Sequence, residues 1–168
     1  MSFDIHFSPA GEGKKVKRMN PFTRKVEEMV SRSLTAADQK AVNAFLKKSG
    51  AKRNAFGSFV LQCVDGGVAE IFGEEISSGF MVTLRGLTPD LLAFLFGLLK
   101  AGNWSMSPVM EEAVVITTSL DRVEKAEGPE RVVVCASPEE LGALLSGGLK
   151  AWQKYRDRVL GDAKRRAE

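Results

Sequence analysis

The chain has 168 residues, of which 44% are hydrophobic and 27% are charged, a composition that suits one globular domain and argues against a disordered or repetitive chain. Two cysteines, Cys63 and Cys135, are too few for a disulfide framework, so a reducing compartment is expected. The net charge of +3 conceals a basic region over residues 1–64, an acidic region over 65–140 and a basic region over 141–168. Because neither a signal peptide nor a membrane-spanning segment is indicated, the sequence predicts a cytoplasmic protein.

The first third of the chain predicts a strand, a hairpin and a helix. Apolar and polar residues alternate over residues 2–8, as in a strand with one buried face. Residues 14–30 predict an exposed basic hairpin around the turn at 20–23. Residues 35–50 begin with a capping-box pattern and then place apolar residues at helical spacing, which predicts an amphipathic helix.

The middle of the chain predicts three further strands. Residues 55–64 and 68–72 are rich in β-branched and aromatic residues, and the Asp-Gly-Gly sequence at 65–67 supplies the positive φ angles of a tight turn between them. Residues 79–85 predict a strand that leads into the next helix. Trp104 falls in a predicted loop over residues 103–108.

The most apolar stretch, residues 87–102, predicts a buried helix around which the rest of the chain packs. Thr88 is expected to cap it, Pro89 suits the first helical position, and Gly102 is expected to end it in the left-handed conformation. A sector of small residues around Gly97 lets a neighbouring backbone come close, either where the helix packs on a sheet or at a homodimer interface.

The last third predicts two short strands and a helix. Residues 113–118 and 131–135 read as strands, and a capping box at 137–140 opens a helix that Gly147 and Gly148 kink or divide. The polar end, residues 162–168, is expected to be a frayed tail. These elements together predict a single α+β domain, over residues 1–168, with a mainly antiparallel mixed sheet and helices packed on one face.

Residue chemistry gives little support for an enzyme. His6 is the only histidine and lies on the polar side of the first predicted strand, and no motif spacing suggests a zinc site. Residues 11–15 lack the frame of a phosphate-binding loop, and no serine lies in a nucleophile elbow. We therefore expect no catalytic residues, no metal and no cofactor.

Two charged features remain as candidates. The doublets Glu74-Glu75 and Glu111-Glu112 could hold a cation or act as an acid/base pair, although adjacent side chains point in different directions and a solvated surface explains them equally well. The basic hairpin and tail could grip nucleic acid, but no DNA- or RNA-reading motif accompanies them and the acidic middle would repel phosphate.

Several short segments resemble one bacterial family. They are Ser2-Phe3-Asp4-Ile5, Asn20-Pro21-Phe22-Thr23, Asp65-Gly66-Gly67-Val68-Ala69-Glu70, Leu84-Arg85-Gly86-Leu87-Thr88-Pro89-Asp90, Ala101-Gly102-Asn103-Trp104, Ser137-Pro138-Glu139-Glu140-Leu141, and Trp152 with Tyr155-Arg156-Asp157. The family is that of the SitI-type immunity proteins of swarm-inhibition toxin-immunity pairs. The resemblance implies a cytoplasmic protein that protects its producer from a lipoprotein toxin exchanged between kin cells. It also implies a glycine after the 20–23 turn, where this chain has Arg24.

The leading hypothesis is thus a non-catalytic immunity protein that binds and neutralises a cognate toxin domain. An acidic surface would steer association with a basic toxin, and an aromatic residue could anchor it. The predicted partner-binding residues are Asp65, Glu70, Glu74, Glu75, Trp104, Glu111 and Glu112. The alternative is a nucleic-acid-associated regulator that uses the basic terminal segments.

Overall fold

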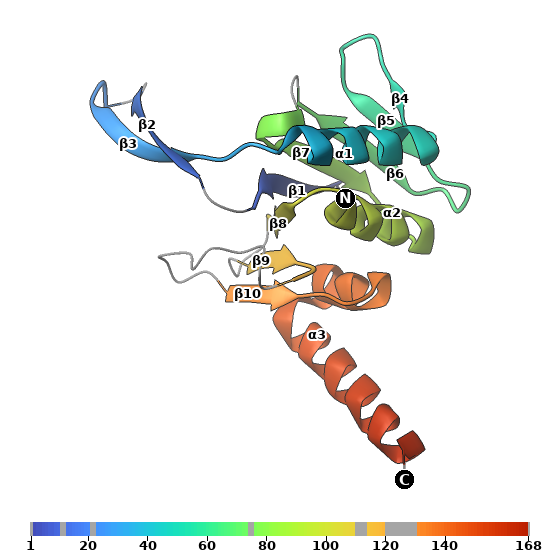
Figure 1. Ribbon diagram of the computed structural model, residues 1–168. Helices are drawn as coiled ribbons and strands as arrows, with labels where there is room; N and C mark the ends of the chain where they lie inside the picture. Colours follow the sequence, from blue (N-terminus) through green and yellow to red (C-terminus); the bar gives the residue numbers. More distant parts are fainter. Residues whose placement is uncertain are drawn as a thin grey trace.

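The computed structural model describes residues 2–10, 13–20, 23–73, 76–109, 114–119 and 131–167, and Figure 1 shows its elements. In chain order these are β1 (Ser2–Pro9), β2 (Lys14–Met19), β3 (Val26–Ser31), α1 (Ala36–Lys48), β4 (Lys52–Arg53), β5 (Phe59–Gln62), β6 (Val68–Phe72), the 3-10 helix η1 (Ile76–Ser78), β7 (Phe80–Arg85), α2 (Pro89–Ala101), β8 (Trp104–Pro108), β9 (Val114–Thr117), β10 (Arg131–Val134) and α3 (Pro138–Ala167). Within these described ranges, no helix combines the length and apolar character needed to cross a bilayer.

Eight strands form one sheet in the order β10-β9-β8-β1-β7-β6-β5-β4, and β2 and β3 form a separate sheet. In the large sheet only β9 and β10 run parallel, while the other neighbouring strands are antiparallel. The predicted α+β fold with a mixed, mainly antiparallel sheet is therefore confirmed. The loop predicted over residues 103–108 is wrong, because β8 occupies most of it and pairs with β1.

Buried and exposed residues alternate along the strands, and this alternation shows which face of the large sheet is covered. In β1, Ile5 and Phe7 are buried, whereas His6 and Ser8 are exposed. The paired strand β7 follows the same pattern, since its buried Val82 lies opposite Ile5. The buried side chains belong to one core cluster that also contains residues of all three helices. One face of the sheet thus packs against the helices, and the other presents its side chains to solvent.

Helix α2 lies between α1 and α3 and contacts both, as well as β8. Its inward residues are fully or almost fully buried. They are Leu91, Phe94, Leu95, Leu98 and Leu99. At Gly97 an added Cβ would lie 2.6 Å from Cζ of Phe45 in α1, whose ring stacks on Phe94 at a centroid distance of 5.6 Å. The small-residue sector therefore receives another helix of the same chain at this position.

Enlarging Gly97 tests this contact. We expect Gly97→Leu to lower the free energy of unfolding by about 1–3 kcal/mol, because the added side chain overlaps the Phe45 ring. Chemical denaturation followed by circular dichroism measures the change. The double variant Gly97→Leu with Phe45→Ala should recover part of the loss, and a stable single variant would contradict the proposed packing.

The prediction for the end of α2 is wrong, whereas the prediction for the start of α3 is confirmed. Gly102 has φ −120°, so the left-handed stop predicted for α2 is wrong. The residue is small for a different reason, since a Cβ there would lie 2.8 Å from Cγ2 of Val42 and 2.9 Å from Cδ1 of Trp104. The capping box of α3 is present: Ser137 Oγ accepts a hydrogen bond from the Glu140 N–H at 3.2 Å, and Glu140 reaches back to the N–H of Ala136.

Helix α3 has two parts that meet at Gly148, which has φ 68° and ψ −166°. The first part packs against α2, and the second projects away from the body of the molecule in Figure 1. The predicted kink therefore occurs at the second glycine of the pair. Helix α3 continues to Ala167, so the predicted tail is helical up to that residue, and its fraying stays a prediction. This end is rich in Ala, Lys and Arg, which favour helix.

Candidate interaction surface

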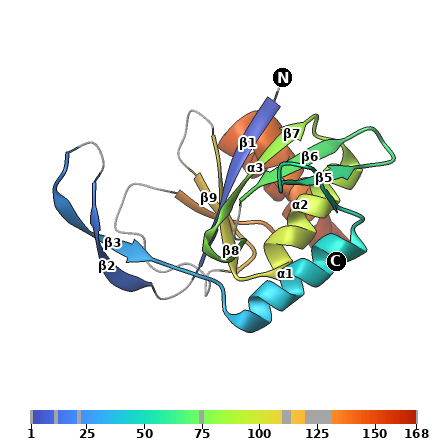
Figure 2. The same cartoon turned by 90° about the horizontal axis from the view of Figure 1, so that it is seen from above.

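Strands β2 and β3 form a two-stranded ribbon, called the arm below, over residues 14–31. The strands pair antiparallel from Lys14 opposite Ser31 to Met19 opposite Val26, as expected for the hairpin predicted over residues 14–30. Figures 1 and 2 show the arm standing away from the sheet and helices. No residue of the arm belongs to the hydrophobic core cluster found in the described residues.

The turn of the arm is closed by hydrogen bonds at its base. Asn20 donates its N–H to the carbonyl of Lys25 at 2.8 Å, and its carbonyl accepts one from the N–H of Arg24 at 2.8 Å. The Asn20 side chain also donates to Glu27 at 3.0 Å. Arg24 has φ 54°, the only positive φ of a non-glycine residue in the described ranges. The turn therefore requires the left-handed conformation at the position where the family resemblance implies glycine.

Replacing Arg24 by glycine should stabilise the arm. A non-glycine residue in the left-handed region costs about 1 kcal/mol, which glycine avoids. Because the arm shares no core with the body, the gain should appear locally. We expect Arg24→Gly to slow hydrogen exchange of the Asn20 amide, measured by NMR, by about fivefold. Exchange that is unchanged or faster would contradict backbone strain at Arg24.

One face of the arm exposes apolar side chains. Met19, Val26 and Val30 are 67%, 63% and 50% exposed, and the register places all three on the same face of the ribbon. An isolated two-stranded hairpin is marginally stable in water because it buries little apolar surface. The exposed stripe is thus surface that a partner could cover.

The arm is also strongly basic. Residues 14–31 contain six Lys and Arg residues against two Glu residues. Four of the basic residues, Lys14, Lys15, Lys17 and Arg18, lie exposed on β2. One cross-strand ion pair joins Lys15 Nζ to Glu28 Oε2 at 3.9 Å, with both side chains largely exposed, and such a pair contributes little to stability. The charge is therefore available to an acidic partner.

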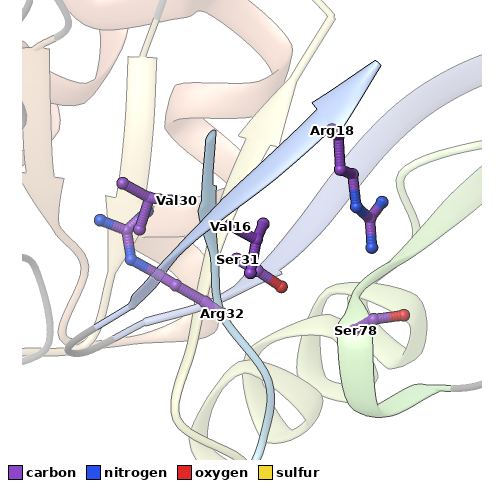
Figure 3. Close-up of a pocket in the computed structure, with 6 residues that line it drawn as sticks. All are labelled: Val16, Arg18, Val30, Ser31, Arg32 and Ser78. Carbon is purple, nitrogen blue, oxygen red and sulfur yellow. The ribbon is translucent and has the colours of Figure 1, made fainter. Parts of the chain in front are cut away.

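A cavity of about 320 Å³ lies at the root of the arm. Its lining residues come from the arm, the segment that follows it and η1: Val16, Arg18, Val30, Ser31, Arg32 and Ser78. Figure 3 shows the guanidinium of Arg18 on the side of Ser78 and that of Arg32 on the opposite side, near Val30. The lining therefore combines basic, hydroxyl and apolar side chains.

Asp65, a predicted partner-binding residue, has a structural role at the start of α2. Its carboxylate lies in the turn between β5 and β6 and accepts hydrogen bonds from the N–H of Asp90 at 2.8 Å and the N–H of Gly67 at 3.2 Å. Thr88 occupies the N-cap position of α2 as predicted, but its side chain makes no capping hydrogen bond. Asp65 caps α2 from 25 residues earlier in the chain.

Burial acts to raise the pKa of Asp65, but the N–H groups of Asp90 and Gly67 outweigh it, and the pKa lies below its ordinary value. The carboxylate therefore stabilises the fold above the ordinary pKa, and this contribution is lost as the pH falls through the folded-state pKa. We expect Asp65→Asn to be less stable than the wild type at pH 7 and the difference to shrink at acidic pH. Urea unfolding at several pH values measures the stability of both proteins. A difference in stability that does not change with pH would contradict the capping role.

The other predicted partner-binding residues do not assemble into one site. Glu70 is half-buried on the solvent face of the sheet, where it accepts a hydrogen bond from the Asn54 side chain at 3.5 Å. Glu74, Glu75, Glu111 and Glu112 lie outside the described residues.

The prediction that Trp104 anchors a partner is wrong, because its side chain is fully buried. It packs edge-on against the rings of Phe80 at 5.0 Å and Phe7 at 6.4 Å, between centroids. Both phenylalanines are core residues of the large sheet, and their own rings are stacked at 4.8 Å. Trp104 therefore stabilises the core and offers no surface to a partner.

An exposed aromatic residue that the sequence did not single out lies in the loop between β4 and β5. Phe56 is 93% exposed. Its N–H and that of Ser58 donate to the Asn54 side chain at 2.9 and 3.1 Å, which fixes the loop, and Gly57 takes a positive φ of 84°. An exposed aromatic ring on a loop held by hydrogen bonds is typical of residues that anchor interfaces.

A second cavity, of about 400 Å³, lies between α1, the end of β5 and α2, and includes Cys63 among its lining residues. Burial, together with the charges of Asp65 and Asp90, raises the pKa of the Cys63 thiol. Burial, with a smaller effect of Glu140, raises the pKa of Cys135 to about 12. Both thiols are protonated at neutral pH, which makes them poor nucleophiles. In the part of the chain that the structure describes, no group of three or more His, Cys, Asp or Glu side chains could hold a metal ion.

Comparison with known proteins identifies no relative of the chain. No protein-family model, no curated protein and no solved structure matches the chain. The arm, with its exposed apolar stripe, its basic strand and the cavity at its root, is the surface that most resembles a binding site.

Proposed function

We propose that the protein is a non-catalytic immunity protein, which binds a cognate toxin domain in the cytoplasm and blocks the toxin's active site or its access to substrate. In this role it protects the producing cell from toxin delivered by kin bacteria. The resemblance of segments along most of the chain to SitI-type immunity proteins supports the proposal. The observation that carries it is the arm, a basic ribbon with apolar side chains left exposed to solvent.

The geometry of the arm suits binding better than catalysis. It presents a charged strand and an apolar stripe, and the cavity at its root is lined by Arg, Ser and Val side chains. The basic strand β2 attracts an anionic surface, and the residues that line the cavity include no general base. The acidic doublets 74–75 and 111–112 stay predicted contacts with the toxin.

Co-expression tests this function directly. Cells that express the toxin domain encoded next to this chain's gene should die without the chain and grow with it. The purified proteins should also form a complex in size-exclusion chromatography. Absence of both the rescue and the complex would refute the proposal.

The charge of the arm also favours a second candidate, a nucleic-acid-associated regulator. Phosphate contacts would make the affinity fall steeply as salt rises. Titration of duplex DNA and single-stranded RNA in a gel shift at low and high salt distinguishes the two functions, because an immunity protein should shift neither nucleic acid at physiological salt.

A further inference from the structure

The cavity that includes Cys63 lies where α1 ends, β5 ends and α2 begins. Its volume of about 400 Å³ falls within the range of small-molecule pockets, which is about 300–1,000 Å³. Phe45, near the end of α1, lies against Phe94 and Gly97 of α2, which brings these helix ends together. Figures 1 and 2 show them on the side of the body away from the arm. The cavity is therefore a second candidate site, separate from the surface proposed to bind the toxin.

Core side chains form the wall of this cavity. Leu61 and Phe94 are each 6% exposed and belong to the core cluster, and Phe45 packs against that cluster. The rings of Phe45 and Phe94 are stacked, with an angle of 25° between their planes. Because packing in the core fixes these side chains, the apolar wall is formed before a ligand binds. An apolar or aromatic group that lies against this wall is removed from water, which favours binding.

Asp90 gives the cavity a negative charge. It is exposed, and it is the one charged residue among the described residues that line the cavity. Its N–H donates a hydrogen bond to the Asp65 carboxylate at 2.8 Å, so a second negative charge lies beside it. Burial raises the pKa of the Cys63 thiol most, and the charges of Asp65 and Asp90 raise it further, so the field of both carboxylates reaches the cavity wall. Lys47 and Lys48, at the exposed end of α1, are not among the lining residues.

The start of α2 also brings the positive end of its helix dipole to this region. That end is equivalent to about half an elementary charge. The carboxylates of Asp65 and Asp90 each carry a full negative charge and outweigh it. The net field therefore favours a cation over an anion.

We propose that this cavity binds a small organic cation in which an ammonium group is joined to an apolar or aromatic body. The body packs against Leu61, Phe45 and Phe94, and the ammonium group pairs with the Asp90 carboxylate. Such a ligand matches both features of the cavity, whereas an uncharged apolar molecule uses only the wall and an anion is repelled by Asp90. The site is independent of the proposed function, so an absence of ligand binding would leave the immunity function standing.

Titration of the full chain with phenethylammonium, followed by NMR, tests the proposal. We expect saturable shifts of the backbone amides of Cys63, Ala93 and Phe94, with a Kd of about 1–10 mM, as is typical of so small a ligand. 2-Phenylethanol has the same shape without the charge, and its Kd should be about threefold higher, since an exposed ion pair contributes a factor of that size. Phenylacetate, which Asp90 repels, should bind at least about tenfold more weakly than phenethylammonium. Absence of saturable shifts, or equal Kd values for phenylacetate and phenethylammonium, would overturn the proposal.

Asp90→Asn tests the ion pair. This change removes the charge and keeps the main-chain N–H that donates to Asp65. We expect the Kd for phenethylammonium to rise about threefold and the Kd for 2-phenylethanol to stay the same, which a merely structural effect would not produce. Asp157→Asn is the matched control, because Asp157 is exposed on α3 and its loss should leave both Kd values unchanged. An equal change in the Kd of both ligands on Asp90→Asn would overturn the specificity for a cation.

Ala93→Leu tests the location of the ligand. Ala93 lines the cavity from an exposed helix position, so a leucine there should occupy part of the cavity without disturbing the core. We expect it to raise the Kd of both ligands at least about tenfold, because it covers the apolar wall. Ala44→Leu, at an exposed position of α1 outside the lining, should leave both Kd values unchanged. Circular dichroism should show similar melting temperatures for the two variants. Unchanged Kd values for a folded Ala93→Leu variant would place the ligand elsewhere and overturn the proposal.

Discussion

Removal of the arm is expected to abolish protection against the toxin while the body of the protein stays folded. In this variant a short Gly-Ser linker replaces residues 14–31. The gap is small, because a Cβ on Gly13 would lie 3.0 Å from Cγ of Arg32, so a few residues suffice. No arm residue contributes to the core cluster of the described residues, so the melting temperature should change little.

The measurement for this first prediction is survival of cells that express the toxin domain together with either form of the protein. We expect the armless variant to lower the colony count by at least about a hundredfold, as expected when the main contacts of an interface are lost. Lys47→Gln with Lys48→Gln should protect like the wild type. Full protection by a folded armless protein would place the binding surface elsewhere.

Truncation of Trp104 is expected to give the largest loss of stability. The side chain is fully buried against Phe7 and Phe80, and removal of a large aromatic side chain from a core costs about 3–5 kcal/mol. Many domains have a total stability of about 5–15 kcal/mol, so Trp104→Ala should be close to unfolded at 37 °C. Denaturation by guanidinium chloride, followed by tryptophan fluorescence of Trp152 and by circular dichroism, measures the change.

This variant also separates a core role from the anchor role that the sequence predicts for Trp104. A core residue changes stability and leaves the Kd of the folded fraction unaltered, whereas an interface anchor raises the Kd at constant stability. Phe56→Ala is the matched control, because that ring is exposed and its removal should not lower stability. Unchanged stability of Trp104→Ala would contradict the packing described here.

Local patterns predicted the fold where they are strong. The alternation of apolar and polar residues in β1, the turn signal at 65–67 and the apolar character of α2 each identified the right element. β8 was missed because its serines and Pro108 have low strand propensity, although Trp104 and Met106 alternate with them as in a half-buried strand.

Contacts between distant residues explain the remaining errors at the ends of α2. Asp65 caps this helix from the preceding hairpin, and Gly102 is small because Val42 and Trp104 lie next to it. Neither contact follows from local sequence, since helix-end rules consider only neighbouring residues.

The candidate site was predicted only in part. The sequence indicated an exposed basic hairpin, but it placed the partner on acidic residues elsewhere. Whether Met19 and Val26 face a core or solvent depends on where the ribbon lies relative to the body, which short-range patterns do not specify. Phe56 was not singled out because the sequence places it in the strand predicted over residues 55–64, whereas β5 begins only at Phe59.

Isothermal titration of the purified toxin domain into the wild-type and armless proteins tests the central claim, that the arm binds the partner. We expect the wild type to saturate at one toxin domain per chain with a submicromolar Kd, and the armless protein to give no binding heat. Equal Kd values for the two proteins would contradict it.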